Sequence, residues 1–244
     1  MFDLSGRVAL VTGAGQGVGA GVSEVLAAAG ATVHVNDLLA ARAEEVAYAI
    51  GGHAAPFDVS DYDAVVEAVS KIGAVDILVN NAGIPPSMKP VQFRDLDPSA
   101  WSPYIDVNLY GVLNCAKATI DGMCERGFGR VITISSGAGQ TGLGIGVSIY
   151  AAGKGGGISF MRHLAVECGT SGVTANTLSL GVMQRGTPDG EADRTVTAGA
   201  EQRIPVGRLG TGVDVGYACV YLASNEASWI TGQTIGLNGG SLTS

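Results

Sequence analysis

The sequence RVALVTGAGQGVG, residues 7–19, decides the fold that we expect. Its first half is a short apolar run rich in valine, which is typical of a strand buried on both faces. A glycine-rich turn follows at once, and a helical pattern then continues to residue 29, where Gly30 provides a C-cap. Residues 32–36 form a second apolar strand pattern. A strand, a tight turn, a helix and a second strand make a βαβ unit, which predicts parallel strands.

The glycines of this turn have distinct tasks. Gly13 permits the tight turn, Gly17 lets the backbone approach a pyrophosphate, and Gly19 lets the helix pack closely on the strand. Gln16 and Val18 lie between them, at the start of the helix. The free N–H groups and the positive dipole end of a helix N-terminus bind phosphate. The turn therefore predicts a dinucleotide-binding site that includes all five residues.

Asp37 follows the second strand, 20 residues after Gly17. A carboxylate at this position accepts hydrogen bonds from the adenosine ribose hydroxyls and repels the 2′-phosphate of NADP. Neither Gln16 nor Leu38 is a cation that would compensate, and Arg42 is expected on the next helix. We therefore expect NAD as the cofactor, with NADP as the weaker alternative.

Strand and helix patterns alternate along the rest of the chain. Further strands are expected at residues 53–57, 76–79, 130–134, 173–178 and 234–237, and helices at 40–50, 61–72, 98–125, from before 150 to 169, and 214–223. Pro103 lies one turn inside the third of these helices, where we expect a local irregularity. This alternation predicts an α/β fold, a Rossmann-like doubly wound parallel sheet with helices on both faces, in a single domain over residues 1–244. Gly13, Asp37, Asp58 and Asn81 all fall at carboxyl ends of strands, the edge where such sheets bind ligands.

Composition excludes several classes of protein. A net charge of −8 argues against nucleic-acid binding. No apolar stretch approaches membrane-spanning length, and the first residues do not have the pattern of a signal peptide. The four cysteines form no CxxC pair, which fits a reduced, cytoplasmic protein, and we expect no metal site.

Tyr150 and Lys154 have the spacing that brings two side chains onto one face of a helix. An ammonium group near the tyrosine ring would favour the phenolate and lower the tyrosine pKa from about 10, as a general acid/base requires. An ordinary surface pair has the same spacing, so the pair alone is weak evidence. From its place within a helix, Asn108 reads as an amide satisfied in the core.

Several motifs occur together and in order. They are Thr12-Gly13-x3-Gly17-x-Gly19, Asp58-Val59, Asn80-Asn81-Ala82-Gly83, Asn108, Ser136, Tyr150-x3-Lys154 and Gly232-Gln233…Gly239-Gly240. With this set, the chain resembles the short-chain dehydrogenase/reductase family over essentially its whole length. The resemblance implies a sheet of about seven strands, a nicotinamide cofactor and a homotetramer or homodimer.

The resemblance also implies roles for individual residues. Tyr150 would exchange the hydroxyl proton, Lys154 would lower its pKa and bind the nicotinamide ribose, and Ser136 would hydrogen-bond the substrate oxygen. Asn108 would sit at a helix irregularity and hold a water linked to Lys154. The remaining cofactor contacts would come from Asp58, Val59, Asn81, Ala82, Gly83 and the backbone of Met183.

The chain departs from the family pattern in two places near the site. Ser136 precedes Tyr150 by 14 residues, one more than usual, so Ser148 is an alternative hydroxyl. After the sixth strand, Leu180-Gly181 replaces the usual Pro-Gly, and Arg185 stands where a threonine is common, with Thr187 displaced.

The leading hypothesis is an NAD-dependent oxidoreductase that interconverts a secondary alcohol and a ketone. One rival is a 3-oxoacyl-thioester reductase that uses NADPH, although Gly127 and Ser171 stand where acyl-carrier-protein reductases often carry basic residues. A rival of another class is a non-catalytic dinucleotide-binding module. The substrate would be set by loops at 84–98 and 138–148 and by a lid at about 182–206, which is too long for a simple connection.

Overall fold

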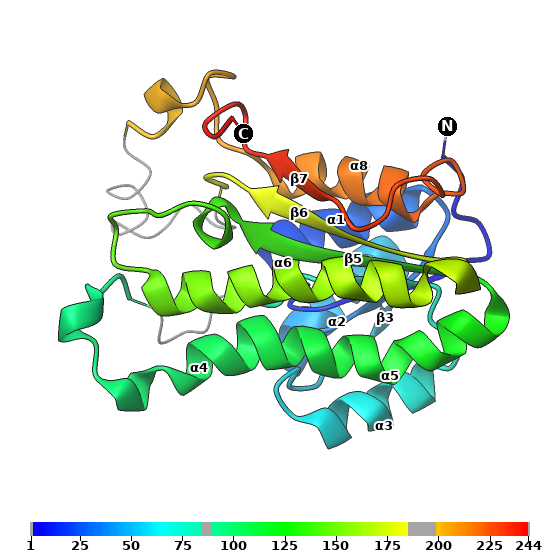
Figure 1. Ribbon diagram of the computed structural model, residues 1–244. Helices are drawn as coiled ribbons and strands as arrows, with labels where there is room; N and C mark the ends of the chain where they lie inside the picture. The colour runs from blue at the N-terminus through cyan, green and yellow to red at the C-terminus, as the bar shows by residue number, and fades with distance from the viewer. Residues whose placement is uncertain (1, 84–88, 185–198, 244) are drawn as a thin grey trace.

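Seven parallel strands form one sheet at the centre of the molecule (Figure 1). The computed structural model describes residues 2–83, 89–184 and 199–243, so parts of the predicted substrate loops, including Arg185 and Thr187, lie outside it. The strand order is β3-β2-β1-β4-β5-β6-β7. The strands are β1 Val8–Val11, β2 Thr32–Val35, β3 His53–Ala54, β4 Ile77–Asn80, β5 Gly129–Ser136, β6 Val173–Leu180 and β7 Thr234–Leu237. The order reverses between β1 and β4, and this reversal is the switch point where doubly wound folds bind their ligands.

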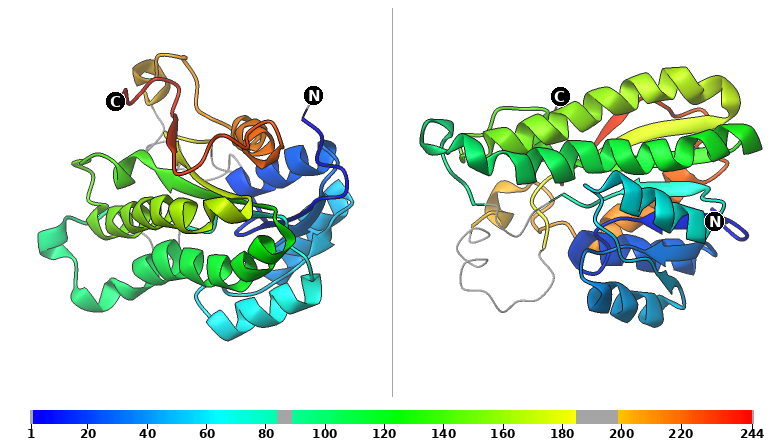
Figure 2. Two further views of the ribbon diagram at one scale, coloured as in Figure 1. Left: turned by 45° about the vertical axis from the view of Figure 1, so that its right-hand side comes forward. Right: turned by 90° about the horizontal axis from the view of Figure 1, so that it is seen from below.

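Helices cover both faces of the sheet, as the two further views show (Figure 2). The main helices are α1 Gly17–Ala28, α2 Ala40–Ile50, α3 Tyr62–Ile72, α4 Ser102–Ile105, α5 Gly111–Arg126, α6 Ser148–Cys168 and α8 Gly212–Ala223. Helices α1, α2 and α8 pack on one face and α3, α5 and α6 on the other. Short 3-10 turns lie at Phe93–Asp95, Pro98–Ala100, Gly137–Gly139, Gly169–Ser171 and Glu201–Arg203.

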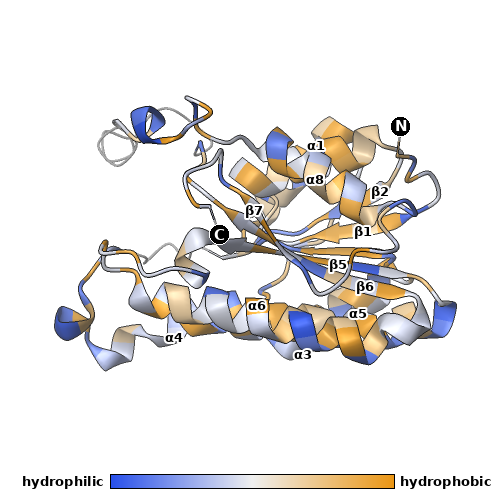
Figure 3. Ribbon diagram, turned by 45° about the horizontal axis from the view of Figure 1, so that its top comes forward, coloured by the Kyte–Doolittle hydropathy of each residue, from blue (hydrophilic) through white to orange (hydrophobic). Residues whose placement is uncertain are grey.

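The core consists of two apolar layers, one on each side of the sheet. Side chains such as Val11, Val33 and Ile77 face α1 and α8, while Leu10, Leu78 and Val131 face α5 and α6. Both layers are needed because strands covered by helices on both faces have no solvent-facing side. In Figure 3, β1 is accordingly coloured as hydrophobic along its length, while β5 and β6 also carry polar residues. Among the described residues, no helix has the length and apolar character needed to cross a bilayer.

The predicted fold class is therefore confirmed. Several strand and helix boundaries differ from the predicted ones, and for β3 and β5 the reason is identifiable. Strand β3 ends at Ala54 rather than residue 57, because the Asn36 side chain donates to the carbonyls of Ala55 and Phe57 and replaces a strand partner there. Strand β5 continues to Ser136, beyond the predicted end at 134, because β6 pairs with it in register over its whole length.

The helix predicted from residue 98 is interrupted at Asn108, as the family resemblance implies, and not at Pro103. A 3-10 turn comes first, α4 begins at Ser102, and a π-helix over Asp106–Tyr110 leads into α5. Pro103 lies in the first turn of α4, where proline is tolerated, so it is not the irregularity itself. The irregularity is the wide turn that contains Asn108. Such π-turns inside helices are frequent at functional sites.

Candidate active site

The glycine turn after β1 is tied to the end of β4 by a single buried hydroxyl. The Thr12 side-chain oxygen accepts hydrogen bonds from the backbone N–H groups of Asn81 at 3.0 Å and Ala82 at 3.1 Å. In return, the Asn81 side chain donates to the carbonyls of Thr12 and Gly13, each at 2.9 Å. A Cβ on Gly13 would lie 2.8 Å from the Ala82 Cα, so the two turns are in direct backbone contact. The predicted phosphate turn and the Asn81–Gly83 segment therefore form one rigid unit.

On its other side, the same turn is held by β2. Gly13 N–H donates to the Asn36 side-chain oxygen at 3.2 Å, and Gly15 N–H donates to one oxygen of Asp37 at 3.2 Å. The second Asp37 oxygen accepts from Leu39 N–H at 3.0 Å. Asp37 is only 8% exposed, and its carboxylate lies directly beside the glycine turn. Arg42 lies on α2, as expected, with its Cβ against Gly15.

The N-terminus of α1 is suited to an anion. Its N-cap, Gln16, makes no capping bond with its side chain, and the first turn contains no acidic residue. Gly13 and Gly17 have φ angles of 58° and 56°, in the left-handed region that glycine adopts without strain. Gly19 is packed so closely that a Cβ there would lie 2.5 Å from the Asn81 side chain. Uncapped N–H groups beside a glycine turn fit the pyrophosphate of a dinucleotide.

Tyr150 and Lys154 lie on the first two turns of α6, near the carboxyl end of β5. The Lys154 nitrogen is 5.9 Å from the centre of the Tyr150 ring and donates to the Ile134 carbonyl at 2.7 Å. Lys154 is only 5% exposed, and its burial lowers the pKa of the ammonium to about 8. In the described part of the chain no acidic side chain forms an ion pair with it. The lysine is therefore a buried cation that is held by one backbone carbonyl.

The pKa of Tyr150 differs in direction from the sequence-based expectation. Burial raises the pKa of Tyr150 above its ordinary value, and a hydrogen bond to Ser136 only partly opposes this rise. Tyr150 is half-buried, the ammonium lies beside its ring, and no described hydrogen bond joins the ammonium to the tyrosine hydroxyl, so burial decides the direction of the shift. The protein without a cofactor therefore does not lower the pKa of Tyr150 as the sequence-based prediction expected.

Asn108 is placed by the π-helix so that its side chain faces the same point as Lys154. Its nitrogen donates to the Tyr104 carbonyl at 2.8 Å, while its oxygen is buried without a protein partner among the described residues. A Cβ on Gly83 would lie 2.5 Å from the Lys154 nitrogen and 3.0 Å from the Asn108 oxygen. The prediction that Asn108 is an amide satisfied in the core is therefore wrong, because only its nitrogen has a hydrogen-bond partner among the described residues.

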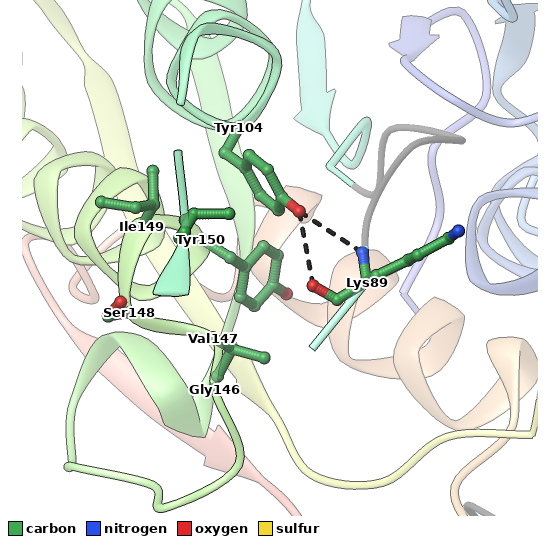
Figure 4. Close-up of a pocket in the computed structure, with 8 residues that line it drawn as sticks. Lys89, Tyr104, Gly146, Val147, Ser148, Ile149 and Tyr150 are labelled. Atoms are coloured by element: carbon green, nitrogen blue, oxygen red, sulfur yellow. Dashed lines mark hydrogen bonds between the residues drawn. The ribbon is translucent and has the colours of Figure 1, made fainter. Parts of the chain in front are cut away.

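Of the two candidate hydroxyls, Ser136 is the one that contacts Tyr150. Ser136 lies at the end of β5, and its oxygen also accepts from Ala138 N–H at 3.2 Å. Ser148 is the first residue of α6 and is exposed. In Figure 4 its hydroxyl lies on the far side of the helix start from the Tyr150 hydroxyl.

A small hollow lies against Tyr150 (Figure 4). Its lining combines residues from the loop after β4, from α4, from the loop before α6 and from the first turn of α6. They are Lys89, Leu96, Tyr104, Gly146, Val147, Ser148, Ile149 and Tyr150.

The other predicted cofactor residues lie at the same edge of the sheet, with less defined roles. Asp58 is half-buried and accepts two hydrogen bonds from Ser60, and Val59 is buried with its carbonyl bound by Asn114. Met183 is half-buried and pairs with Gly210 through an isolated bridge. No described contact joins these residues to Tyr150 or Lys154.

Asn36 and Tyr104 escaped the sequence reasoning, and Thr12 was named in the glycine motif without a role of its own. The side chain of Thr12 connects β1 to β4, that of Asn36 connects the turn to the segment after β3, and Tyr104 contacts both Asn108 and Lys89. Thr12 and Asn36 each stand at the end of an apolar strand, which was the available signal. Tyr104 carries no such signal, because its role depends on a loop 15 residues away.

Comparison with known proteins agrees with this geometry. The family described as Enoyl-(Acyl carrier protein) reductase matches residues 13–241. Acetoacetyl-CoA reductase from Shinella zoogloeoides is 38% identical over 241 residues, covering 96% of this chain and 98% of the relative. The 3-oxoacyl-[acyl-carrier-protein] reductase of Escherichia coli (strain K12) is 36% identical, with 98% of each chain covered.

The solved structures agree as well. A 3-oxoacyl-[acyl-carrier protein] reductase with bound NAD from Brucella melitensis has a TM-score of 0.89 and 34% identity, covering 98% of this chain and 92% of its own. The chain belongs to the short-chain dehydrogenase/reductase family. It is therefore an NAD(P)-dependent oxidoreductase that acts on a carbonyl or alcohol group.

Proposed function

We propose that the protein transfers a hydride between NAD(H) and a secondary alcohol or ketone, with Tyr150 as the general acid/base. The observation that carries the proposal is the buried ammonium of Lys154 beside the Tyr150 ring, which has no ion-pair partner among the described residues, with Ser136 next to the tyrosine hydroxyl. A buried charge is costly, and such perturbed groups cluster at functional sites.

Four side chains have separate roles in the proposed proton transfer. In ketone reduction, Tyr150 gives its hydroxyl proton to the substrate oxygen, while Ser136 donates a hydrogen bond to the same oxygen as charge develops there. Lys154 stabilises the phenolate that remains. The free oxygen of Asn108 can accept a hydrogen bond from a water that returns a proton toward Lys154. When bound, the nicotinamide supplies the hydride, or accepts it in the reverse direction.

The same edge of the sheet fits the cofactor. The pyrophosphate would bind at the uncapped N-terminus of α1, near Gln16, Gly17 and Val18, and the adenosine ribose at Asp37. Tyr150 and Lys154 would contact the nicotinamide ribose, with Asn81, Ala82 and Gly83 beneath it. Asp58, Val59 and the Met183 backbone complete the proposed set of contacts.

The test of the acid/base assignment is Tyr150→Phe. We expect loss of ketone reduction by about a thousandfold or more, with the Kd for NADH within about threefold of wild type, because only the proton donor is removed. Tyr217→Phe, on the exposed face of α8, is the matched control and should leave both quantities unchanged. Turnover by Tyr150→Phe near the wild-type rate would contradict the assignment.

We propose NAD rather than NADP because of Asp37. Its buried carboxylate stands beside Gly15, where a 2′-phosphate would meet like charge. Asp37→Asn keeps the shape and an acceptor but removes the charge. We expect the ratio of kcat/KM with NADPH to that with NADH to rise about a hundredfold, since hydrogen bonds to charged groups contribute about 1.5–3 kcal/mol each. An unchanged ratio would show that Asp37 does not select the cofactor.

A second candidate, reduction of a 3-oxoacyl thioester with NADPH, is favoured by the names of the relatives. Gly127 and Ser171 provide no basic side chain for an acidic carrier protein, which weighs against a carrier-bound substrate. Acetoacetyl-CoA and a panel of simple ketones, each assayed with NADH and with NADPH, separate the two. NADH binding without any turnover would instead favour a non-catalytic module.

We also propose a homo-oligomer, a tetramer or a dimer, working in the cytoplasm on a small alcohol or ketone. The family membership supports the assembly, and size-exclusion chromatography with light scattering tests it.

A further inference from the structure

Two loops that are far apart in the sequence meet beside Tyr150. One is the segment 89–96 that leads from β4 toward α4, and the other is the loop 137–147 between β5 and α6. Both contribute to the hollow in Figure 4, and the Tyr150 hydroxyl faces into it. The position of one loop relative to the other therefore sets the space next to the proposed reacting group.

The loops are joined by a backbone contact at Gly146. Val91 N–H donates to the Gly146 carbonyl at 2.8 Å. Gly146 has a φ of 72°, in the left-handed region, and a Cβ there would lie 2.8 to 2.9 Å from backbone atoms of Val91. Any other residue would be strained and would push Val91 away.

Tyr104 holds the same segment at a second point. Its hydroxyl lies 3.3 Å from the Lys89 N–H nitrogen and 3.5 Å from the Lys89 carbonyl oxygen, as the dashed lines in Figure 4 mark. The Tyr104 side chain is buried, and its backbone carbonyl accepts from Asn108. The segment 89–91 is thus attached both to the loop before α6 and to the helix that carries Asn108.

We propose that the segment 89–91 and Gly146 form a clasp that sets the width of the substrate pocket, which makes Gly146 a specificity-determining position. The inference rests on the proposed function, because it concerns the ketone that Tyr150 would protonate. Leu96, Val147 and Ile149 line the hollow, and the Lys89 amino group points away from Tyr150. The clasp therefore selects for a short, uncharged alkyl arm on the carbonyl carbon.

The decisive variant is Gly146→Ala. The added methyl group clashes with the Val91 backbone, so the hydrogen bond between the loops is lost and the pocket widens. One methylene in an apolar pocket is worth about 10-fold to 200-fold in selectivity. We expect the ratio of kcat/KM for ethyl 3-oxohexanoate to that for ethyl acetoacetate to rise at least about fivefold, with the Kd for NADH within about twofold of wild type.

Gly144→Ala is the matched control from the same loop. Gly144 does not have a positive φ, and no described atom lies within 4 Å of a Cβ there. The ratio of kcat/KM for the two esters should be the same in Gly144→Ala as in wild type. Tyr104→Phe removes the other attachment without a steric clash and should shift the ratio in the same direction as Gly146→Ala, which keeps the proposal testable if Gly146→Ala does not fold.

A second readout does not depend on turnover. Hydrogen exchange of the peptide that contains Val91 should be faster in Gly146→Ala than in Gly144→Ala, because the amide has lost its acceptor. Equal exchange in the two variants would overturn the clasp, whatever the activity. Faster exchange with unchanged selectivity would overturn its role in specificity. Failure of the wild type to reduce either ester with NADH or NADPH would instead count against the proposed function.

Discussion

Gly83 offers the sharpest test of the arrangement around Lys154. A methyl group on Gly83 would lie 2.5 Å from the Lys154 nitrogen, whereas ordinary contact begins at 3.4 Å. The ammonium must therefore withdraw by about 0.9 Å, and it cannot do so freely, because it is buried and bound to the Ile134 carbonyl at 2.7 Å. A misplacement of about 1 Å at a reacting group can cost about a hundredfold in rate, and a hydrogen bond to a charged group contributes about 1.5–3 kcal/mol. We expect kcat/KM of Gly83→Ala for a ketone to fall about a hundredfold.

The assay is ketone reduction followed by NADH oxidation, with circular dichroism to confirm folding. Gly169→Ala, at the far end of α6 with no described atom within 4 Å of its Cβ, should remain within about twofold of wild type. A double-mutant cycle makes the test specific. In a Lys154→Met background, Gly83→Ala should lower kcat/KM much less, because the ammonium is gone and only the Asn108 oxygen, 3.0 Å from the new methyl group, remains crowded. The reasoning is refuted if Gly83→Ala keeps kcat/KM within about threefold of wild type.

Three further predictions concern stability. Thr12→Val leaves the N–H groups of Asn81 and Ala82 without an acceptor, so urea unfolding should show a loss of about 2–4 kcal/mol, while Thr12→Ser should lose much less. The pKa of Lys154 in the folded state is about 8, below its ordinary value of 10.5. The free energy of unfolding of wild type, measured relative to that of Lys154→Met, should therefore rise as the pH increases between these two values. A difference that does not change with pH would contradict the burial argument. Burial and the neighbouring His53 lower the pKa of His34 below 6.5. The stability that His34 contributes above pH 6.5 should therefore be lost on acidification, and His34→Gln should lose less stability over the same pH range. Thermal melts at a series of pH values measure both losses.

The fold was predictable because its signals are local. The strand β7 and the helix α2 have the bounds that the pattern of apolar residues indicates. Where prediction failed, a distant side chain was responsible. The Asn36 amide ends β3 by binding two carbonyls of the next segment, and nothing in residues 53–57 announces this.

The candidate site was predictable in its residues and less so in its energetics. The spacing of Tyr150 and Lys154 indicated one helix face, and the structure agrees. The direction of the Tyr150 pKa could not be read from spacing, since it depends on how deeply the neighbouring loops enclose the ring. The contacts of Tyr104 and Gly146 were equally hidden, because both depend on a loop that approaches from another part of the chain.

The electrostatics of the site have a consequence for cofactor binding. Without a cofactor, burial works against both charged forms, raising the pKa of Tyr150 and lowering that of Lys154 to about 8. At pH 7 the tyrosine keeps its proton and the lysine, with a pKa of about 8, is still mostly charged, but the phenolate that proton donation leaves is disfavoured by burial. Hydroxyl groups that bind the Lys154 ammonium would raise the lysine pKa again, and a positive ring beside Tyr150 would lower the tyrosine pKa. A bound cofactor would therefore oppose both effects of burial on this pair of side chains.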